Sequence, residues 1–325
     1  MSTLRNTPPT HVHSLFVSNG DAYIAVPFGD QAFIWKNGEC LYHLSEWSRI
    51  SRLSVCVSGN EVFVAGIAKN SLDEWVTALW KNGEVLYLLN EGEDRVDEVS
   101  LCVAGGDVRA FGLVNEKELP SVAIMWENGK ETRRYTMKEP EHAFASSVFA
   151  FDGDVYAAGF VYTWNDEPGR EWTAVVWKNG EPLYRFTGEA GGAVVSSVFA
   201  SGGDVYCVGF EPVRNQMVAM VWKNGDVLWR IGHETLASWA ESVYVAGQDV
   251  YVAGCVGESL EDSVAMVWKN GQPLYSLSSG NSIVLLGEIA VSGDDVYVTA
   301  QELIDGCLDS VGRLWKNGAS VDLLC

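Results

Sequence analysis

The tetrapeptide Trp-Lys-Asn-Gly occurs six times in this 325-residue sequence, and Trp-Glu-Asn-Gly occurs once. The seven tryptophans are Trp35, Trp80, Trp126, Trp177, Trp222, Trp268 and Trp315. Successive members are separated by 45, 46, 51, 45, 46 and 47 residues. Periods of this length are typical of solenoids, propellers and other arrays built from one repeated unit, so the content of one unit decides the fold.

One unit, residues 242–277, contains four short segments: SVYVAG, QDVYVAG, VAMVWKNG and QPLYSL. Each is rich in β-branched and aromatic residues and is bounded by Gly, Asn or Asp, which predicts four strands. The Asn-Gly pair suits a type I′ turn from the third strand to the fourth. The preceding tryptophan would bring a large apolar surface to the sheet. We therefore assign the tetrapeptide a structural role: a hairpin with a core anchor.

The repeat predicts an all-β fold, a seven-bladed β-propeller with four antiparallel strands per blade and one sequence repeat per blade. An acidic residue opens every second strand: Asp21, Glu61, Asp107, Asp154, Asp204, Asp249 and Asp295. No helical periodicity interrupts the units. A β-solenoid is the alternative, but it would need shorter and more uniform rungs.

We expect an N-terminal segment, 1–12, and one propeller domain, 13–325. The expected blades are approximately 13–45, 53–90, 99–137, 146–188, 196–232, 241–279 and 287–325. Each blade would then come from one contiguous segment, and the ring would close through packing between the seventh blade and the first. In a permuted alternative, the blades would straddle the repeats.

The YVAG and WKNG segments resemble those of bacterial kelch-like seven-bladed propeller proteins, most of which are uncharacterised. The resemblance covers the chain from Ser14 to its C-terminus and implies the fold but no activity. Kelch second strands usually end in a double glycine. This sequence instead has Ala253-Gly254 and Val208-Gly209, which weakens the kelch comparison.

The formal net charge of −21 argues against nucleic-acid and anionic-membrane partners, because both require clustered Lys and Arg. No apolar run is long enough to span a bilayer, and the first residues lack the features of a signal peptide. The seven cysteines include no Cys-x-x-Cys pair, so we expect free thiols in a reducing cytoplasm. Secretion is the alternative if a leader peptide was removed. A monomer is expected.

Two faces of the predicted disc differ in chemistry. The hairpin face carries the turns within blades, where the seven acids and six repeat lysines should form local ion pairs. The loop face carries the longer connections, which contain many acids and additional aromatic residues. The candidate binding residues are Trp47, Trp75, Trp164, Trp172, Trp239, Asp166 and Glu171. Alternatively, these tryptophans pack beneath their loops, and the acids are simply solvated.

A second candidate set lies on the first strands, which should line the central channel. Alignment of the units places Ser14, Ser54, Ser100, Ser147, Ser197, Ser242 and Glu288 at one position. We call this set the channel ring. In the alternative interpretation, the converging strands need only small side chains that can hydrogen-bond. Glu288 breaks the rule, and such breaks often mark functional or strained sites.

The sequence contains no nucleophile elbow, zinc-protease motif or phosphate-binding glycine loop. We therefore assign no catalytic residue, metal site or cofactor. The expected function is a non-enzymatic binding or scaffold module whose acidic, Trp-bearing loop face recognises a protein or peptide. The alternative is a carbohydrate-binding or glycoside-hydrolysing propeller with its site at the channel mouth, since indoles stack on sugars and carboxylates can act in pairs.

Overall fold

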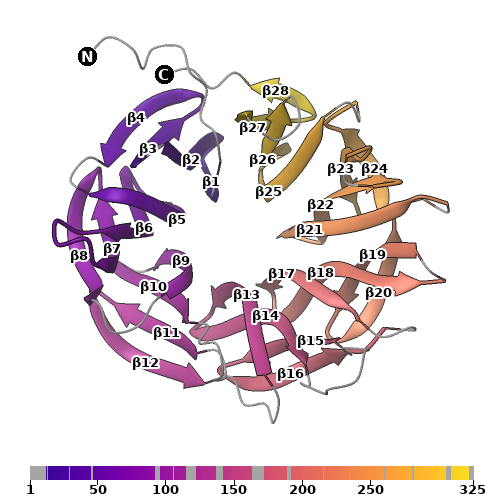
Figure 1. The fold of residues 1–325 in the computed structure, drawn as a ribbon, viewed down its shortest axis with the longest axis horizontal. Coiled ribbons are helices and arrows are strands. Elements are labelled where there is room, and N and C mark those ends of the chain that lie inside the picture. Colours follow the sequence, from indigo (N-terminus) through magenta and orange to yellow (C-terminus); the bar gives the residue numbers. More distant parts are fainter. Residues whose placement is uncertain are drawn as a thin grey trace.

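A computed structural model of the chain describes residues 12 and 14–321, except 29, 45–46, 92–95, 105, 115–121, 137–141, 163–171, 189–191, 215, 234, 260, 280–281 and 305–308. These residues form seven four-stranded antiparallel sheets that stand around a common centre (Figure 1). The predicted seven-bladed propeller is confirmed.

The first three blades contain twelve strands. In chain order they are β1 (Ser14–Ser18), β2 (Asp21–Phe28), β3 (Gln31–Lys36), β4 (Glu39–Leu44), β5 (Ser48–Ser58), β6 (Glu61–Lys69), β7 (Trp75–Lys81), β8 (Glu84–Glu91), β9 (Val96–Ala104), β10 (Asp107–Val114), β11 (Val122–Glu127) and β12 (Lys130–Thr136).

The last four blades contain the other sixteen strands. They are β13 (His142–Phe151), β14 (Asp154–Tyr162), β15 (Trp172–Lys178), β16 (Glu181–Phe186), β17 (Val194–Ser201), β18 (Asp204–Val213), β19 (Gln216–Lys223), β20 (Asp226–Ile231), β21 (Ala237–Ala246), β22 (Asp249–Gly257), β23 (Val264–Lys269), β24 (Gln272–Ser276), β25 (Ile283–Ser292), β26 (Asp295–Ile304), β27 (Asp309–Lys316) and β28 (Ala319–Val321).

Every sheet is built from four consecutive strands in chain order, so each blade is one contiguous segment and the permuted alternative is wrong. The first strand of each blade lies nearest the centre of the ring (Figure 1). Several of these inner strands begin a few residues before the expected blade starts. For example, β5 begins at Ser48 and β21 at Ala237, where the sequence suggested 53 and 241.

All seven Asn-Gly pairs form the turn that their sequence predicts. Asn37 and Gly38 have φ values of 53° and 89°, and Asn270 and Gly271 have 51° and 76°. Positive φ at both central residues defines the type I′ turn, whose twist matches that of the strands. Packing gives a second reason for the glycine at Gly129. A Cβ there would overlap the ring of Tyr87 on the preceding blade.

The repeat tryptophans form the core between neighbouring blades. All seven are at most 5% exposed. Trp80 of the second blade packs in one cluster with Ile34 and Leu44 of the first blade. Trp35 of the first blade packs with Tyr297 and Leu314 of the seventh. The expected closure by packing of the seventh blade on the first is therefore present.

A β-bulge explains the glycine that ends YVAG. In the sixth blade, Glu241 is the extra residue between the pairs Ala240–Gly254 and Ser242–Ala253. A Cβ on Gly254 would overlap the carbonyl oxygen of Trp239, so the bulged strand approaches too closely for a side chain. The fifth blade repeats this arrangement with Gly209.

The terminal blades have other residues at this position. In the first blade, the pairing of β1 with β2 among the described residues runs from Ser14–Ala25 to Ser18–Asp21 and does not reach Val26. In the seventh blade, Ala300 takes the glycine position and the inner strand carries Gly287 instead. A Cβ on Gly287 would come within 2.8 Å of Thr299 Oγ1. In this blade the glycine of the bulge thus lies on the inner strand.

Candidate functional site

The hairpin face is held by one polar network that recurs around the ring. In the first blade, Asn37 Nδ2 donates to Asp21 Oδ1 at 2.6 Å, and Asn37 Oδ1 accepts from the Ala22 N–H at 2.9 Å. Lys36 Nζ lies 2.8 Å from Asp21 Oδ2 and 5.4 Å from the Tyr23 ring centroid. The tetrapeptide thus also fixes the start of the second strand.

The lysine–acid ion pair recurs in six blades, at 2.6–2.8 Å, as expected from the sequence. Hydrogen bonds from Lys36 and Asn37 lower the pKa of the Asp21 carboxyl. The groups are partly exposed, so each pair adds little stability. The charges of the repeat lysines and their acids are therefore matched within these six blades. The six pairs are Lys36–Asp21, Lys81–Glu61, Lys178–Asp154, Lys223–Asp204, Lys269–Asp249 and Lys316–Asp295.

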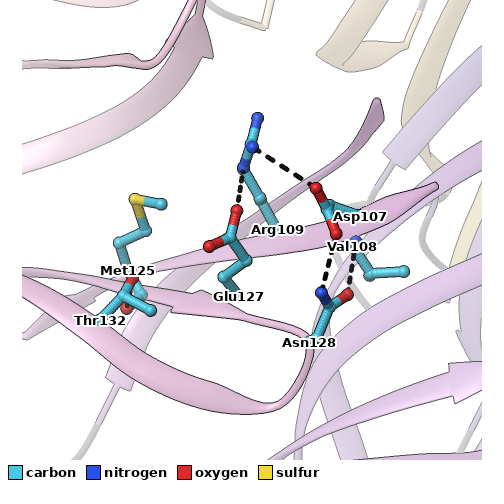
Figure 2. A network of polar contacts seen from close by, with 7 residues as sticks. All are labelled: Asp107, Val108, Arg109, Met125, Glu127, Asn128 and Thr132. Atoms are coloured by element: carbon cyan, nitrogen blue, oxygen red, sulfur yellow. Dashed lines mark hydrogen bonds and ion pairs between the residues drawn. The ribbon is translucent and has the colours of Figure 1, made fainter. Parts of the chain in front are cut away.

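The third blade contains a compensated variant of this network (Figure 2). Glu127 replaces the repeat lysine, and Arg109 replaces the aromatic residue of the second strand. Arg109 Nε donates to Glu127 Oε1 at 2.8 Å, and Arg109 Nη2 lies 3.9 Å from Asp107 Oδ2. Asn128 keeps its bonds to Asp107 and to the Val108 N–H. The two exchanged positions therefore act as a pair.

We expect Glu127→Lys alone to lower the free energy of unfolding by about 0.5–1 kcal/mol, because it places a second cation beside Arg109. Adding Arg109→Tyr should restore stability, since the double variant recreates the Lys–Tyr arrangement of the other blades. Urea unfolding at low salt of the two single variants and the double variant measures this coupling, because urea does not screen charges. Additive effects of the two substitutions would contradict the pairing.

The channel ring is brought together as the sequence alignment suggested. All seven members line one cavity of about 390 Å³ at the inner strands. They come from β1, β5, β9, β13, β17, β21 and β25, one from each blade. The ring comprises Ser14, Ser54, Ser100, Ser147, Ser197, Ser242 and Glu288.

Side-chain oxygens of this ring join neighbouring blades. Ser14 Oγ accepts from the Val55 N–H of the second blade at 3.2 Å, and Ser242 Oγ accepts from the Ile289 N–H of the seventh at 3.1 Å. At the ring closure, Glu288 Oε2 accepts from the Leu15 N–H at 2.6 Å. Glu288 thus extends the serine pattern across the last joint, which supports a structural role for these oxygens.

The carboxyl of Glu288 is held in an unusual setting. Its Oε2 also accepts from Ser14 Oγ at 3.2 Å, and its backbone N–H donates to Thr299 Oγ1 at 3.0 Å. Thr299 itself departs from the apolar residues at this position in the other second strands. Burial raises the pKa of Glu288 to about 7, although hydrogen bonds from Leu15 and Ser14 act in the opposite direction.

Two further carboxyls near the inner strands were not singled out from the sequence. Burial raises the pKa of Glu241 to about 7. Burial also raises the pKa of Glu98, whose Oε1 lies 3.0 Å from Arg52 Nη1, and Glu98 acts electrostatically on Glu288. Charged residues within otherwise apolar inner strands are the signal that could have identified both.

The loop-face tryptophans divide into two groups. Trp47 packs edge-on against Trp80, with ring centroids 6.2 Å apart, and Trp239 packs against the core between the last two blades. By contrast, Trp75 and Trp172 are each 37% exposed. The alternative that the loop tryptophans pack within the protein therefore holds for Trp47 and Trp239 but not for Trp75 and Trp172. Trp164, Asp166 and Glu171 lie outside the described residues.

The two exposed tryptophans are supported by neighbours. Trp172 stacks on Phe160 with ring centroids 5.1 Å apart. Lys69 Nζ lies 5.3 Å from the Trp75 ring centroid and 2.7 Å from Asp73 Oδ1. Each indole thus has one side fixed, while over a third of its surface stays open to solvent.

The loop face also carries unmatched charge. Glu258, Glu261 and Asp262 are exposed, and within the described ranges no Lys or Arg forms an ion pair with them. Other acids are paired: Glu302 accepts from Arg313 at 2.6 Å, and buried Glu211 lies 3.5 Å from Arg230. The excess of negative charge is therefore local rather than uniform.

Other chemistry is limited in the described part of the chain. No group of three or more His, Cys, Asp or Glu is placed to hold a metal ion there. Cys56, Cys207 and Cys255 are buried free thiols, and burial raises their pKa values. Within the same residues, no helix is long and apolar enough to cross a membrane.

Comparison with known proteins gives the fold. No protein-family model matches the chain, and no curated protein matches it. The propeller domain of the Trilobed protease from Pyrococcus furiosus, described as having an open velcro topology, superposes with a TM-score of 0.58 at 9% identity. The match covers 98% of this chain and 97% of that domain.

Two enzymes contain similar structures. Polysaccharide lyase Uly1 matches with a TM-score of 0.54 and 11% identity over 98% of this chain and 91% of its own. The acylaminoacyl peptidase of Pyrococcus horikoshii matches with a TM-score of 0.55 and 10% identity over 97% of this chain. The match covers about half (52%) of the peptidase chain. At these identities the likeness shows a shared propeller fold and nothing about activity.

Proposed function

We propose that this chain is a non-enzymatic binding module whose loop face recognises a protein or peptide with basic and apolar side chains. The observation that carries the proposal is the exposure of Trp75 and Trp172 on that face. Large aromatic side chains that remain exposed on a rigid scaffold are typical of recognition surfaces. The unmatched acids Glu258, Glu261 and Asp262 favour a cationic partner.

The hairpin face has exposed acids such as Glu39, Glu84 and Asp226 too, but within the described residues it has no exposed tryptophan. There, six lysines and their acids are paired within the blades, as in the Lys36–Asp21 and Lys269–Asp249 pairs. We also propose that the chain is related to bacterial kelch-like propellers with YVAG…WKNG repeats. We propose in addition that it is a monomer in a reducing cytoplasm, and the free thiols support that location.

The test is selection from a displayed library of random twelve-residue peptides, followed by fluorescence anisotropy of the enriched sequences. We expect enrichment of Lys, Arg and aromatic residues and weaker binding at high salt. Trp75→Ala with Trp172→Ala should reduce affinity at least about tenfold, since hot-spot aromatics contribute about 2 kcal/mol or more. Leu274→Ala is the matched control, because Leu274 is equally exposed, at 37%, but lies on the outer strand β24.

Enrichment of acidic or neutral peptides would exclude the proposed surface chemistry. Binding that survives loss of both tryptophans would exclude the proposed site.

A carbohydrate site at the channel is the second candidate. It is favoured by Glu288, whose raised pKa of about 7 suits a general acid, and by Glu98 near enough to act on it electrostatically. A glycan array and a panel of chromogenic glycosides test it. Binding or hydrolysis lost in Glu288→Gln would support it, and blank results in both assays would remove it.

A further inference from the structure

The channel cavity has two levels of side chains. The first is the hydroxyl ring with Glu288. Two residues further along the inner strands, the lining includes Phe16, Phe149, Phe199 and Tyr244. The Phe149 and Phe199 rings lie 4.7 Å apart, and those of Phe199 and Tyr244 lie 5.0 Å apart, so three neighbouring blades form a continuous aromatic wall. Polar groups at one level and an aromatic wall beyond are typical of small-molecule sites.

The charged side chains that line this cavity are negative only, within the described residues. Of the described residues that line it, Glu288 is the only one with an acidic or basic side chain other than thiol or phenol. Its Oε2 is occupied by the Leu15 N–H and the Ser14 hydroxyl. No described residue donates a hydrogen bond to Oε1. Glu288 is half-buried, so Oε1 is the oxygen left open for a cation or a hydrogen-bond donor that enters the cavity.

We propose that the channel binds a small organic cation: a primary ammonium group held by Glu288 and the serine ring, with an apolar body against the aromatic wall. A cavity of about 390 Å³ lies in the range used for ligands of this size. The aromatic faces attract cationic groups as well as apolar ones. An anion would meet a carboxylate with no basic side chain in the described cavity lining, and a neutral molecule could donate a hydrogen bond to Oε1 but would not balance its charge.

The neighbouring groups set the pH dependence of this site. The thiols of Cys56 and Cys102 and the phenol of Tyr244 have raised pKa values, so they are neutral near pH 7. Glu98 is paired with Arg52. Two carboxyls titrate near neutrality: Glu288 in the cavity lining and Glu241 on β21.

Proton and ligand compete for the same carboxylate. Glu288 is mainly protonated at pH 6 and mainly ionised at pH 8, whereas an alkylammonium keeps its charge throughout. Affinity should therefore rise by about tenfold from pH 6 to pH 8 and then level off, as linkage requires for a pKa near 7. Glu241 titrates in the same range, so the Glu288→Gln profile separates the two carboxyls.

Three probes of nearly equal shape test the proposal by isothermal titration calorimetry on the full chain: 4-phenylbutylammonium, 4-phenylbutan-1-ol and 4-phenylbutyrate. We expect the ammonium compound to bind at least about tenfold more tightly than the alcohol, and the carboxylate not to bind. Equal affinities for all three, or preference for the carboxylate, would overturn the proposal. This comparison uses only the native protein, so it does not depend on the folding of a variant.

Matched variants then place the site. Glu288→Gln keeps an oxygen for the Leu15 N–H but removes the charge, and it should weaken ammonium binding at least about tenfold and abolish the pH dependence. Asp204→Asn changes the net charge equally on the hairpin face, where Asp204 pairs with Lys223, and should leave binding unchanged. Retained affinity in Glu288→Gln would overturn the assignment. Trp172→Ala should have no effect on ammonium binding, which keeps this site distinct from the loop face.

Discussion

Trp35→Ala is expected to lower the free energy of unfolding by about 3–5 kcal/mol, the range for removing a fully buried large aromatic side chain. Trp35 is 1% exposed and packs with Ala290, Tyr297 and Leu314 of the seventh blade. Among the strands that the structure describes, none crosses this joint, because each sheet is one contiguous segment. The cavity would therefore weaken the closure of the ring itself. Guanidinium unfolding followed by circular dichroism measures the loss.

Matched variants separate the effect of volume from that of hydrogen bonding and of position. The indole N–H of Trp35 is buried without an acceptor among the described groups, so Trp35→Phe sacrifices no hydrogen bond and should cost much less. Trp172→Ala removes a 37% exposed indole and should change stability by about 0.5 kcal/mol or less. Near-native stability of Trp35→Ala would show that the first and seventh blades are held together by other contacts.

Limited proteolysis distinguishes closure from general loss of stability. Trp222 is equally buried but lies between the fourth and fifth blades. Trp222→Ala should reduce stability to a similar degree without opening the joint between the termini. Cleavage at the hairpin joining β1 to β2 should therefore rise earlier in Trp35→Ala. Tyr297, whose hydroxyl donates to the Gly20 carbonyl at 2.9 Å, lies across that same joint.

The fold was predictable because its signals are local and repeated. Asn-Gly selects a turn through the φ values that its two residues tolerate, and the tryptophan two positions earlier selects the buried face. Neither signal depends on the rest of the chain. Because the same four-strand pattern occurs seven times, few folds other than a seven-bladed propeller can accommodate it. Even the exchanged charges of Arg109 and Glu127 follow once the network of the other blades is known.

The candidate sites were only partly predictable. Alignment of the repeats found the channel ring, because its members share one position relative to the second-strand acids. It did not show that Ser14 and Glu288 would bridge blades, since that depends on how neighbouring sheets approach each other. Nor could it separate Trp47, which packs on Trp80, from Trp75, which remains exposed. Both lie outside the repeat, where tertiary packing alone decides burial.

The bulge beside the channel leads to the second large effect: Gly254→Ala is expected to destabilise the protein by about 3 kcal/mol, at the upper end for overpacking. Gly254 does not have positive φ, so alanine suits its backbone and would ordinarily stabilise the chain by about 0.4–1 kcal/mol. In this bulge the new Cβ would overlap the Trp239 carbonyl oxygen, which belongs to the backbone and cannot rotate away as a side chain would.

The control is Gly202→Ala, because Gly202 has a φ of 60° but open space around its Cβ position. Its cost should be only about 1–2 kcal/mol of left-handed backbone strain. Thermal and guanidinium unfolding of both variants gives the comparison, and a Gly254→Ala protein as stable as the native one would disprove the steric explanation. In the seventh blade Ala300 is tolerated at the equivalent position, and there the inner strand carries Gly287. The two steric limits differ, since a Cβ on Gly254 would meet the backbone of the inner strand, whereas a Cβ on Gly287 would meet the Thr299 hydroxyl.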